Sequence, residues 1–255
     1  MLEEIELEEI VSIAKKAGDA IMKIYEKDFS IEYKDDQSPL TQADIESNSV
    51  ICEALKKAYP DIPLLSEENK MVDYEIRKDW EYFWLIDPID GTKEFIKKNG
   101  EFTVNIALIH QSRPVLGVVY APALGDLYKA QEGIGAYKNS QKLPLYRNTS
   151  PENSLKVVAS KSHLSEETQA FIDALKKQTQ TISQVSKGSS LKLVMVAEGA
   201  ADIYPRLAPT MEWDTAAADA IVRMSGKNSY QYAQELEEVL IYNKPELLNP
   251  WFVVK

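Results

Sequence analysis

Two aspartates stand three residues apart directly after an apolar run in the middle of the chain. Residues 82–86 predict a buried strand, and Asp87 and Asp90 follow it on a turn that Pro88 and Gly91 shape. Carboxylates at the end of a strand can hold a hard cation such as Mg²⁺, and free backbone N–H groups can hold a phosphate beside it. Asp, Pro and Gly are also ordinary turn residues, so this stretch alone favours a cation site only modestly over a surface turn.

Acids recur at three other places where an apolar element meets a turn or a helix start. Asp44 follows Thr41 in an acidic variant of the capping box, and Asp214 begins an Ala-rich helix, where it suits a cap. Glu67 and Glu68 follow a short strand and could be plain surface acids. Each acid has a structural explanation when it is taken singly. Those explanations do not account for strand-end acids in both halves of the chain.

The residue types available limit the chemistry of such a cluster. The chain has two His and one Cys, which argues against a zinc site and favours Mg²⁺ or Mn²⁺ held by oxygen ligands. The same scarcity argues against Ser-His-Asp or Cys-His catalysis. Thr92, after the second aspartate, is expected to cap a helix.

The elements that must position these acids can be read from apolar periodicity. The first half predicts helices over residues 3–27 and 41–59, and strands near residues 63–65, 82–86, 102–108, 115–120 and 127–130, with a charged, mobile excursion at residues 69–80. Consecutive strands with few helices between them indicate an antiparallel or mixed sheet. The second half alternates, with strands near residues 156–159, 181–185, 202–204, 239–242 and 251–254 and helices near residues 165–178, 188–198 and 214–224. A polar segment at residues 147–153 is the expected lobe boundary.

Composition excludes several classes of partner. The 255 residues are 44% hydrophobic, which suits one large domain or two packed lobes. A net charge of −11 disfavours nucleic-acid polymers and anionic membranes but still allows a small anionic substrate. A single cysteine allows no intrachain disulfide, the acidic N-terminus is no signal peptide, and no apolar run approaches the roughly 20 residues that span a bilayer. We therefore expect a cytoplasmic protein, either free or peripheral on the inner membrane face.

Three motifs together resemble one family. Residues 65–68 (L-S-E-E), 87–92 (D-P-I-D-G-T) and 213–217 (W-D-T-A-A), in that order, are similar to the inositol monophosphatase superfamily of Mg²⁺-dependent, lithium-sensitive phosphomonoesterases. The stretches at residues 91–96 and 99–105 look most like its bacterial 3'(2'),5'-bisphosphate nucleotidases; inositol monophosphatases usually carry Asn in place of Glu94. The resemblance implies an α+β fold, a layered α-β-α-β-α sandwich. Its lobes would be residues 1–148, with most metal ligands, and residues 149–255, with the substrate contacts and Asp214.

The resemblance also implies roles for the acids. Glu67, Asp87 and the backbone carbonyl of Ile89 would hold a first Mg²⁺, and Asp87, Asp90 and Asp214 a second, with a third ion loosely near Glu67. The Thr92 hydroxyl, paired with Asp44, would orient and deprotonate the metal-bound water. The N–H groups of Gly91 and Thr92 would hold the phosphate that is cleaved.

A second set of residues would select the substrate. By resemblance, His163 would lie near the adenine or ribose, and Ser189, Lys192 and Arg206 would hold the phosphate that is not cleaved. From the residues alone, His163 is better explained as an exposed loop residue, Ser189 and Lys192 as part of a helix start, and Arg206 as a surface charge. The implied function is hydrolysis of adenosine 3',5'-bisphosphate to AMP by a monomer or homodimer, recycling a by-product of sulfate assimilation. The alternatives are an inositol or sugar phosphatase and a non-catalytic metal- or nucleotide-binding homologue.

Overall fold

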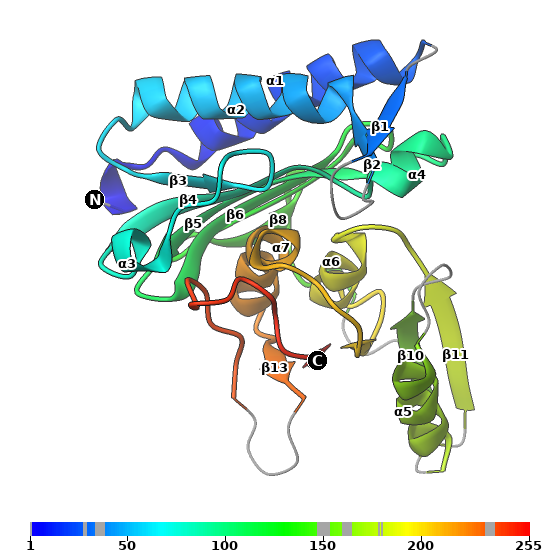
Figure 1. The fold of residues 1–255 in the computed structure, drawn as a ribbon. Coiled ribbons are helices and arrows are strands. Elements are labelled where there is room, and N and C mark those ends of the chain that lie inside the picture. Colours follow the sequence, from blue (N-terminus) through cyan, green and yellow to red (C-terminus); the bar gives the residue numbers. More distant parts are fainter. Residues whose placement is uncertain are drawn as a thin grey trace.

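Seven strands form one mixed sheet at the centre of the molecule (Figure 1). The computed structural model describes residues 2–27, 30–33, 39–146, 154–159, 165–177, 179, 181–232 and 238–255. The sheet has the order β3-β4-β5-β6-β7-β8-β9, in which β3 runs parallel to β4 and each later pair is antiparallel. The strands are β3 Leu64–Ser66, β4 Tyr82–Asp90, β5 Thr103–His110, β6 Arg113–Ala121, β7 Asp126–Gln131, β8 Gly135–Lys138 and β9 Gln141–Lys142. The mixed sheet predicted from the strand pattern is confirmed.

Two long helices, α1 (Leu7–Tyr25) and α2 (Gln42–Ala58), cover one face of this sheet (Figure 1). In α1, apolar residues recur every three to four positions, and Ile10, Ala14 and Ile21 are fully buried. They share one hydrophobic cluster with sheet residues such as Trp84 and Ile106. A short 3₁₀ helix, η1 (Leu2–Glu4), precedes α1. Along the chain between α1 and α2, the strands β1 (Ile31–Tyr33) and β2 (Pro39–Thr41) form a small antiparallel pair. Both helices agree with the sequence prediction.

The helix α7 (Glu212–Met224) packs on the opposite face of the sheet and brings Asp214 to it. Its small side chains allow an unusually close approach, because a methyl group on Gly117 of β6 would lie 2.2 Å from the carbonyl oxygen of Ala217. The helix α6 (Leu191–Glu198) lies beside α7 (Figure 1). The Ala-rich stretch therefore serves first to let a helix sit directly on the sheet.

Smaller sheets complete the second half of the chain. Strands β10 (Ser154–Ala159) and β11 (Thr181–Ser186) pair in parallel and pack with α5 (Glu166–Lys176). Strands β12 (Tyr204–Arg206), β14 (Phe252–Val254) and β13 (Ser229–Gln231) form a three-stranded antiparallel sheet. Helices and sheets thus alternate, which confirms the predicted α+β, layered α-β-α-β-α sandwich.

One hydrophobic cluster joins the two halves of the chain. Phe83 and Leu85 of β4 lie in the same buried cluster as Trp213 and Ala216 of α7. The division into lobes at residue 148 stays a prediction, because residues 147–153 lie outside the described part of the chain. Among the described residues, no helix is both long and apolar enough to cross a membrane.

The structure corrects three predictions around the acids. Strand β4 does not end before Asp87 but runs to Asp90, with a shift in its register against β5 between the two aspartates. Gly91, with a φ of 94°, is the N-cap of the short helix α4 (Thr92–Ile96), so Thr92 is the first helical residue and not the cap. Asp214 is the third residue of α7 rather than its cap. The left-handed backbone of Gly91 lets the chain turn sharply from β4 into α4, a conformation that Thr adopts much less readily.

Two predictions about connecting segments were also wrong. The charged residues 69–80 are anchored rather than a mobile excursion, because they include α3 (Tyr74–Arg77), and buried Arg77 donates hydrogen bonds to the carbonyl oxygens of Lys244 and Pro245. Residues 239–242 form no strand, since Val239 makes a single bridge to Tyr230 of β13, a strand that the sequence prediction missed.

Candidate active site

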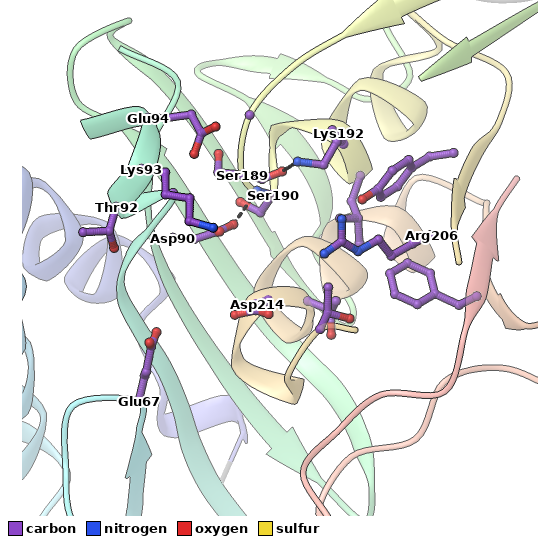
Figure 2. Close-up of a pocket in the computed structure, with 17 residues that line it drawn as sticks. Glu67, Asp90, Thr92, Lys93, Glu94, Ser189, Ser190, Lys192, Arg206 and Asp214 are labelled. Carbon is purple, nitrogen blue, oxygen red and sulfur yellow. Dashed lines mark hydrogen bonds between the residues drawn. The ribbon is translucent and has the colours of Figure 1, made fainter. Parts of the chain in front are cut away.

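Three carboxylates from separate elements meet where β3 ends beside the last residues of β4. Glu67 directly follows β3, and the parallel pairing of Ser66 with Ile86 places it beside Asp87. Asp214 comes from the first turn of α7. One carboxylate oxygen from each of these three residues lies within 4.8 Å of the other two. Figure 2 shows Glu67, Asp90 and Asp214 pointing toward one cavity.

Hydrogen bonds of the surrounding backbone hold these acids in place. The hydroxyl of Ser47 in α2 donates to the carbonyl oxygen of Pro88 at 2.9 Å, which ties the end of β4 to that helix. The backbone N–H of Glu67 donates to the carbonyl of Ile86 at 3.2 Å. The backbone N–H of Met211 donates to the Asp214 carboxylate at 2.8 Å. The cluster is therefore preformed by its own supporting elements.

The acids raise one another's pKa. Burial, followed by repulsion from Glu67 and neighbouring aspartates, holds the pKa of Asp87 well above its ordinary value. Burial and the charge of Asp90 raise the pKa of Asp214 to about 8. Burial raises the pKa of Asp90 to about 6, although the charge of Lys192 and a backbone hydrogen bond from Ser190 act in the opposite direction. Such a cluster requires positive charge to be fully ionised at neutral pH.

The donor set fits a hard divalent cation. Asp87 is buried, and its Oδ1 meets no hydrogen-bond donor among the residues that the structure describes. A buried acceptor in this state is destabilising unless something satisfies it, and the ligand atoms around it are carboxylate oxygens. Glu67, Asp87 and Asp214 are the three best placed to share one ion. The predicted ligand Asp90 lines the same cavity but accepts a hydrogen bond from the backbone N–H of Ser190.

A carboxylate and a hydroxyl stand next to this cluster. The Thr92 hydroxyl lies 3.3 Å from Oδ1 of Asp44 and 3.4 Å from the carbonyl oxygen of Ile89. The other carboxylate oxygen of Asp44 accepts hydrogen bonds from the backbone N–H and the hydroxyl of Thr41, both at 2.7 Å, so the predicted capping box is confirmed. One oxygen of Asp44 thus begins α2, and the other faces Thr92. The Asp44–Thr92 pair has the geometry of a general base and the hydroxyl that it polarises.

The opposite side of the cavity presents buried hydrogen-bond donors. Lys192 is 7% exposed, its ammonium donates to the carbonyl of Ser189 at 2.6 Å, and burial lowers its pKa to about 8. Ser189 Oγ and Arg206 Nε are both buried without a hydrogen-bond partner among the described residues. Two cationic side chains and an unpartnered hydroxyl, shown together in Figure 2, can bind an anionic group.

Most of the predicted site residues line this one cavity, of about 230 Å³. Its lining includes Glu67, Asp90, Gly91, Thr92, Ser189, Lys192, Arg206 and Asp214. His163 lies outside the described residues. Ser190 is a further residue of the site that the sequence did not predict. Its hydroxyl contacts Thr103 Oγ1 at 2.9 Å and donates to Asn105 Oδ1 at 3.0 Å. The polar residues that alternate along β5 were the available signal, because they mark the strand face that meets the second half of the chain.

The comparisons with known proteins agree with this fold and this site. The chain belongs to the inositol monophosphatase family, whose model matches residues 3–249. It is 46% identical over 254 residues to a Salmonella typhimurium protein named 3'(2'),5'-bisphosphate nucleotidase CysQ, with 97% of this chain and 98% of the relative covered. The protein of the same name from Escherichia coli K12 is 43% identical over the same shares.

Solved structures give the same result. The crystal structure of CysQ from Bacteroides thetaiotaomicron, described as a bacterial member of the inositol monophosphatase family, is 45% identical and superimposes with a TM-score of 0.87 over 98% of this chain and 96% of that one. A Bartonella henselae suhB protein is 26% identical with a TM-score of 0.74, over 88% of this chain and 86% of that one. The family resemblance predicted from the three motifs is confirmed.

Proposed function

We propose that this protein is a Mg²⁺-dependent phosphomonoesterase that converts adenosine 3',5'-bisphosphate to AMP and phosphate, thereby recycling a by-product of sulfate assimilation. One observation carries the proposal: a single cavity has clustered carboxylates on one side and buried Lys192 and half-buried Arg206 on the other. A substrate with two phosphates on one nucleoside suits both sides at once. The CysQ relatives at 43–46% identity carry a name for this activity.

The acids would hold the metal ions. Glu67, Asp87 and the Ile89 carbonyl would bind one Mg²⁺, and Asp87, Asp90 and Asp214 a second, and by resemblance a third ion would sit loosely near Glu67. When bound, the ions supply counter-charge to the phosphate and lower the pKa of the attacking water. The orphaned Oδ1 of Asp87 and the mutually raised pKa values of the aspartates support this assignment.

The Asp44–Thr92 pair would prepare the water. The proton of the attacking water would pass to Asp44 through the Thr92 hydroxyl, which lies 3.3 Å from Oδ1 of Asp44. The phosphate that is cleaved would rest on the backbone N–H groups of Gly91 and Thr92, which both line the cavity. This arrangement also argues against a non-catalytic binding protein, because the cap of α2 uses one carboxylate oxygen of Asp44 while the other faces Thr92.

The phosphate that is retained would bind on the other side. Ser189, Lys192 and Arg206 offer one hydroxyl and two cations, and Ser189 Oγ and Arg206 Nε have no partner among the described residues. His163 would contact the adenine or ribose, by resemblance to the nucleotidases. A substrate with one phosphate would leave these buried donors unsatisfied, and that is the basis for selecting a bisphosphate.

Phosphate release from three esters tests the proposal. The substrates are adenosine 3',5'-bisphosphate, inositol 1-phosphate and fructose 1,6-bisphosphate, each with and without Mg²⁺. We expect the adenosine bisphosphate to have the highest kcat/KM and to require Mg²⁺. A preference for inositol 1-phosphate would replace the nucleotidase assignment with an inositol phosphatase, and no turnover of any ester would support the non-catalytic alternative.

A further inference from the structure

The segment that carries Ser189 is attached to a distant part of the chain by one carboxylate. Oε2 of Glu101 accepts the backbone N–H of Gly188 at 2.8 Å, and Oε1 of Glu101 lies 3.1 Å from the ammonium of Lys187. Glu101 precedes β5, and these two partners join β11 to α6. Both oxygens of the carboxylate are thus used, one on a backbone N–H and one on a cation. We call this three-residue contact the Glu101 clasp.

The two segments touch without any intervening space. A methyl group on Gly188 would lie 2.7 Å from the carbonyl oxygen of Glu101 and 2.7 Å from Cγ of Glu94, closer than real side chains approach. On the far side of Ser189, the backbone N–H of Ser190 donates to the carboxylate of Asp90. The segment is therefore fixed on both sides of Ser189 by residues from the first half of the chain.

Ser189 itself has a backbone conformation that needs such support. Its φ is 48°, in the left-handed region that residues other than Gly, Asn and Asp adopt uncommonly. Its carbonyl oxygen accepts the ammonium of Lys192 at 2.6 Å, and its buried hydroxyl faces the cavity (Figure 2). Strained backbone of this kind persists only where the surroundings hold it. The clasp is the contact nearest to Ser189 on its N-terminal side.

We propose that Glu101 is a positioning residue for the retained phosphate: through Gly188 it holds Ser189, and through the Ser189 carbonyl it holds Lys192. Glu101 does not line the cavity and acts without touching the substrate. The inference rests on the function proposed above and assigns a residue that sets the affinity for the second phosphate. An ordinary exposed ion pair would contribute little, but this carboxylate also accepts a backbone N–H, and its side chain is 26% exposed.

Paired substitutions separate positioning from charge. Glu101→Ala removes the acceptor for the Gly188 N–H, whereas Glu101→Gln removes the charge but keeps an oxygen that can accept it. The control is Glu132→Ala, which removes a half-exposed carboxylate 3.7 Å from Arg113 at the far end of the sheet. We expect Glu101→Ala to raise KM for adenosine 3',5'-bisphosphate about tenfold, as loss of one charge-assisted hydrogen bond would, with kcat within about twofold of wild type. Glu101→Gln and Glu132→Ala should stay near the wild-type KM.

Binding of AMP, measured by titration calorimetry on the Mg²⁺-loaded protein, supplies a readout without turnover. AMP carries only the phosphate that is not cleaved, so its Kd should rise about as much as KM in Glu101→Ala and should recover in Glu101→Gln. Gly188→Ala, which forces the two segments apart, should weaken AMP binding in the same way. This variant replaces Glu101→Ala in the test if Glu101→Ala does not fold. An unchanged AMP Kd in Glu101→Ala or Gly188→Ala, or an equal loss in Glu101→Ala and Glu101→Gln, would overturn the positioning role.

The two proposals fail differently. If the wild-type protein turns over no bisphosphate but AMP binding still weakens in Glu101→Ala and Gly188→Ala and not in Glu101→Gln or Glu132→Ala, the proposed function is wrong and the clasp stands. If the wild type hydrolyses the bisphosphate and every variant matches it in KM and in AMP Kd, the function stands and the clasp does not.

Discussion

The two sides of the cavity are built in different ways. On the acidic side, two carboxylates are fixed by residues close to them in sequence: Asp44 by Thr41, and Asp214 by Met211. On the basic side, the decisive contacts join residues far apart in the sequence. Gly188 is held by Glu101, 87 residues away, and Ser190 by Asp90, 100 residues away. Local contacts therefore orient Asp44 and Asp214, although the packing of α7 on the sheet is what brings Asp214 to the other acids. The segment around Ser189, in contrast, is held by contacts that form only once both halves have packed together.

Each side is also electrostatically incomplete without the ligand of the other. Burial raises the pKa of Asp90 and Asp214, to about 6 and about 8, and lowers the pKa of Lys192 to about 8. A cation would complete the acids, and a phosphate would complete the cationic side chains. A phosphate ester bound with divalent metal supplies both, so a single ligand complex satisfies opposite requirements across one cavity.

Removing the central acid should have the largest effect. Asp87→Asn keeps the shape of the side chain but removes a charge from the middle of the cluster. We expect kcat to fall roughly a thousandfold, because Asp87 is the proposed ligand of both metal ions and its loss would forfeit about 4 kcal/mol of transition-state stabilisation. The metal-free variant should melt at a higher temperature than wild type, because repulsion among the acids is relieved. Phosphate release measures kcat, and calorimetry measures the melting temperature of the metal-free protein. Asp173→Asn, at an exposed position, is the control for both. A near-normal rate would refute the acidic side as the metal site.

Asp44→Asn should have the next largest effect. The amide oxygen can still accept from the backbone N–H of Thr41, while an NH₂ group replaces the oxygen that faces Thr92. We expect kcat to fall about a hundredfold, as for loss of a general base, with the melting temperature almost unchanged. The contrasting variant is Thr41→Val, which removes the capping hydroxyl and should lower stability by about 1 kcal/mol with a much smaller loss of kcat. Equal kinetic losses in the two variants would mean that Asp44 acts only as a helix cap.

The local and distant contacts explain what could be predicted from the sequence. Asp44, Glu67 and Asp214 could be singled out because each stands where an apolar element meets a turn or a helix start, and their proposed roles came from the family resemblance of the three motifs taken together. The extension of β4 to Asp90 was not foreseen, since Pro88 normally interrupts a strand; here the register shift between the aspartates accommodates it. Gly91 took the cap position because its left-handed backbone turns the chain more sharply than Thr92 could.

The burial and the distant contacts of the basic side could not be predicted from the residues alone. Lys192 was assigned only through the family resemblance, because a lysine at a helix start has no sign of burial in its own neighbourhood. Its burial depends on β12, whose Tyr204 ring lies 5.9 Å from the ammonium. The Glu101 clasp was likewise invisible, since nothing near Glu101 in sequence indicates a partner in another part of the chain. Tertiary packing decides such contacts, and packing has no short sequence signal.

Lys192→Met should raise KM selectively for adenosine 3',5'-bisphosphate, and the effect should be smaller than the loss of kcat in the two acid variants. The substitution removes the buried cation proposed to bind the retained phosphate, a loss of about 2 kcal/mol, or roughly thirtyfold in KM for adenosine 3',5'-bisphosphate. KM for 3'-AMP, which lacks the second phosphate, should change far less. Steady-state kinetics with both substrates give the ratio, and Lys176→Met, on the exposed face of α5, is the matched control. An equal loss for both substrates would place Lys192 at the cleaved phosphate instead.

The last effect concerns stability rather than catalysis, and it is a pH dependence of the metal-free protein. Asp214 has a folded pKa of about 8 and Asp90 of about 6, against an ordinary 3.8, so between these values the folded state binds more protons than the unfolded state. The free energy of unfolding should therefore fall as the pH rises from about 4 to about 8. Lys192 acts in the opposite sense above its folded pKa of about 8, since its ordinary value is 10.5, so stability should pass through a minimum near pH 8.

Thermal unfolding in a chelator and in Mg²⁺ measures this dependence. Mg²⁺ binds the ionised acids, so it should remove most of the decline and raise the melting temperature at pH 8 by several degrees, with a smaller gain at pH 5. Asp214→Asn should flatten the metal-free profile, whereas Asp173→Asn should leave it unchanged. A metal-free profile that is already flat would show that the acids do not repel one another in the folded protein. The acidic side would then be an ordinary buried polar cluster, and its contrast with the basic side would lose its electrostatic basis.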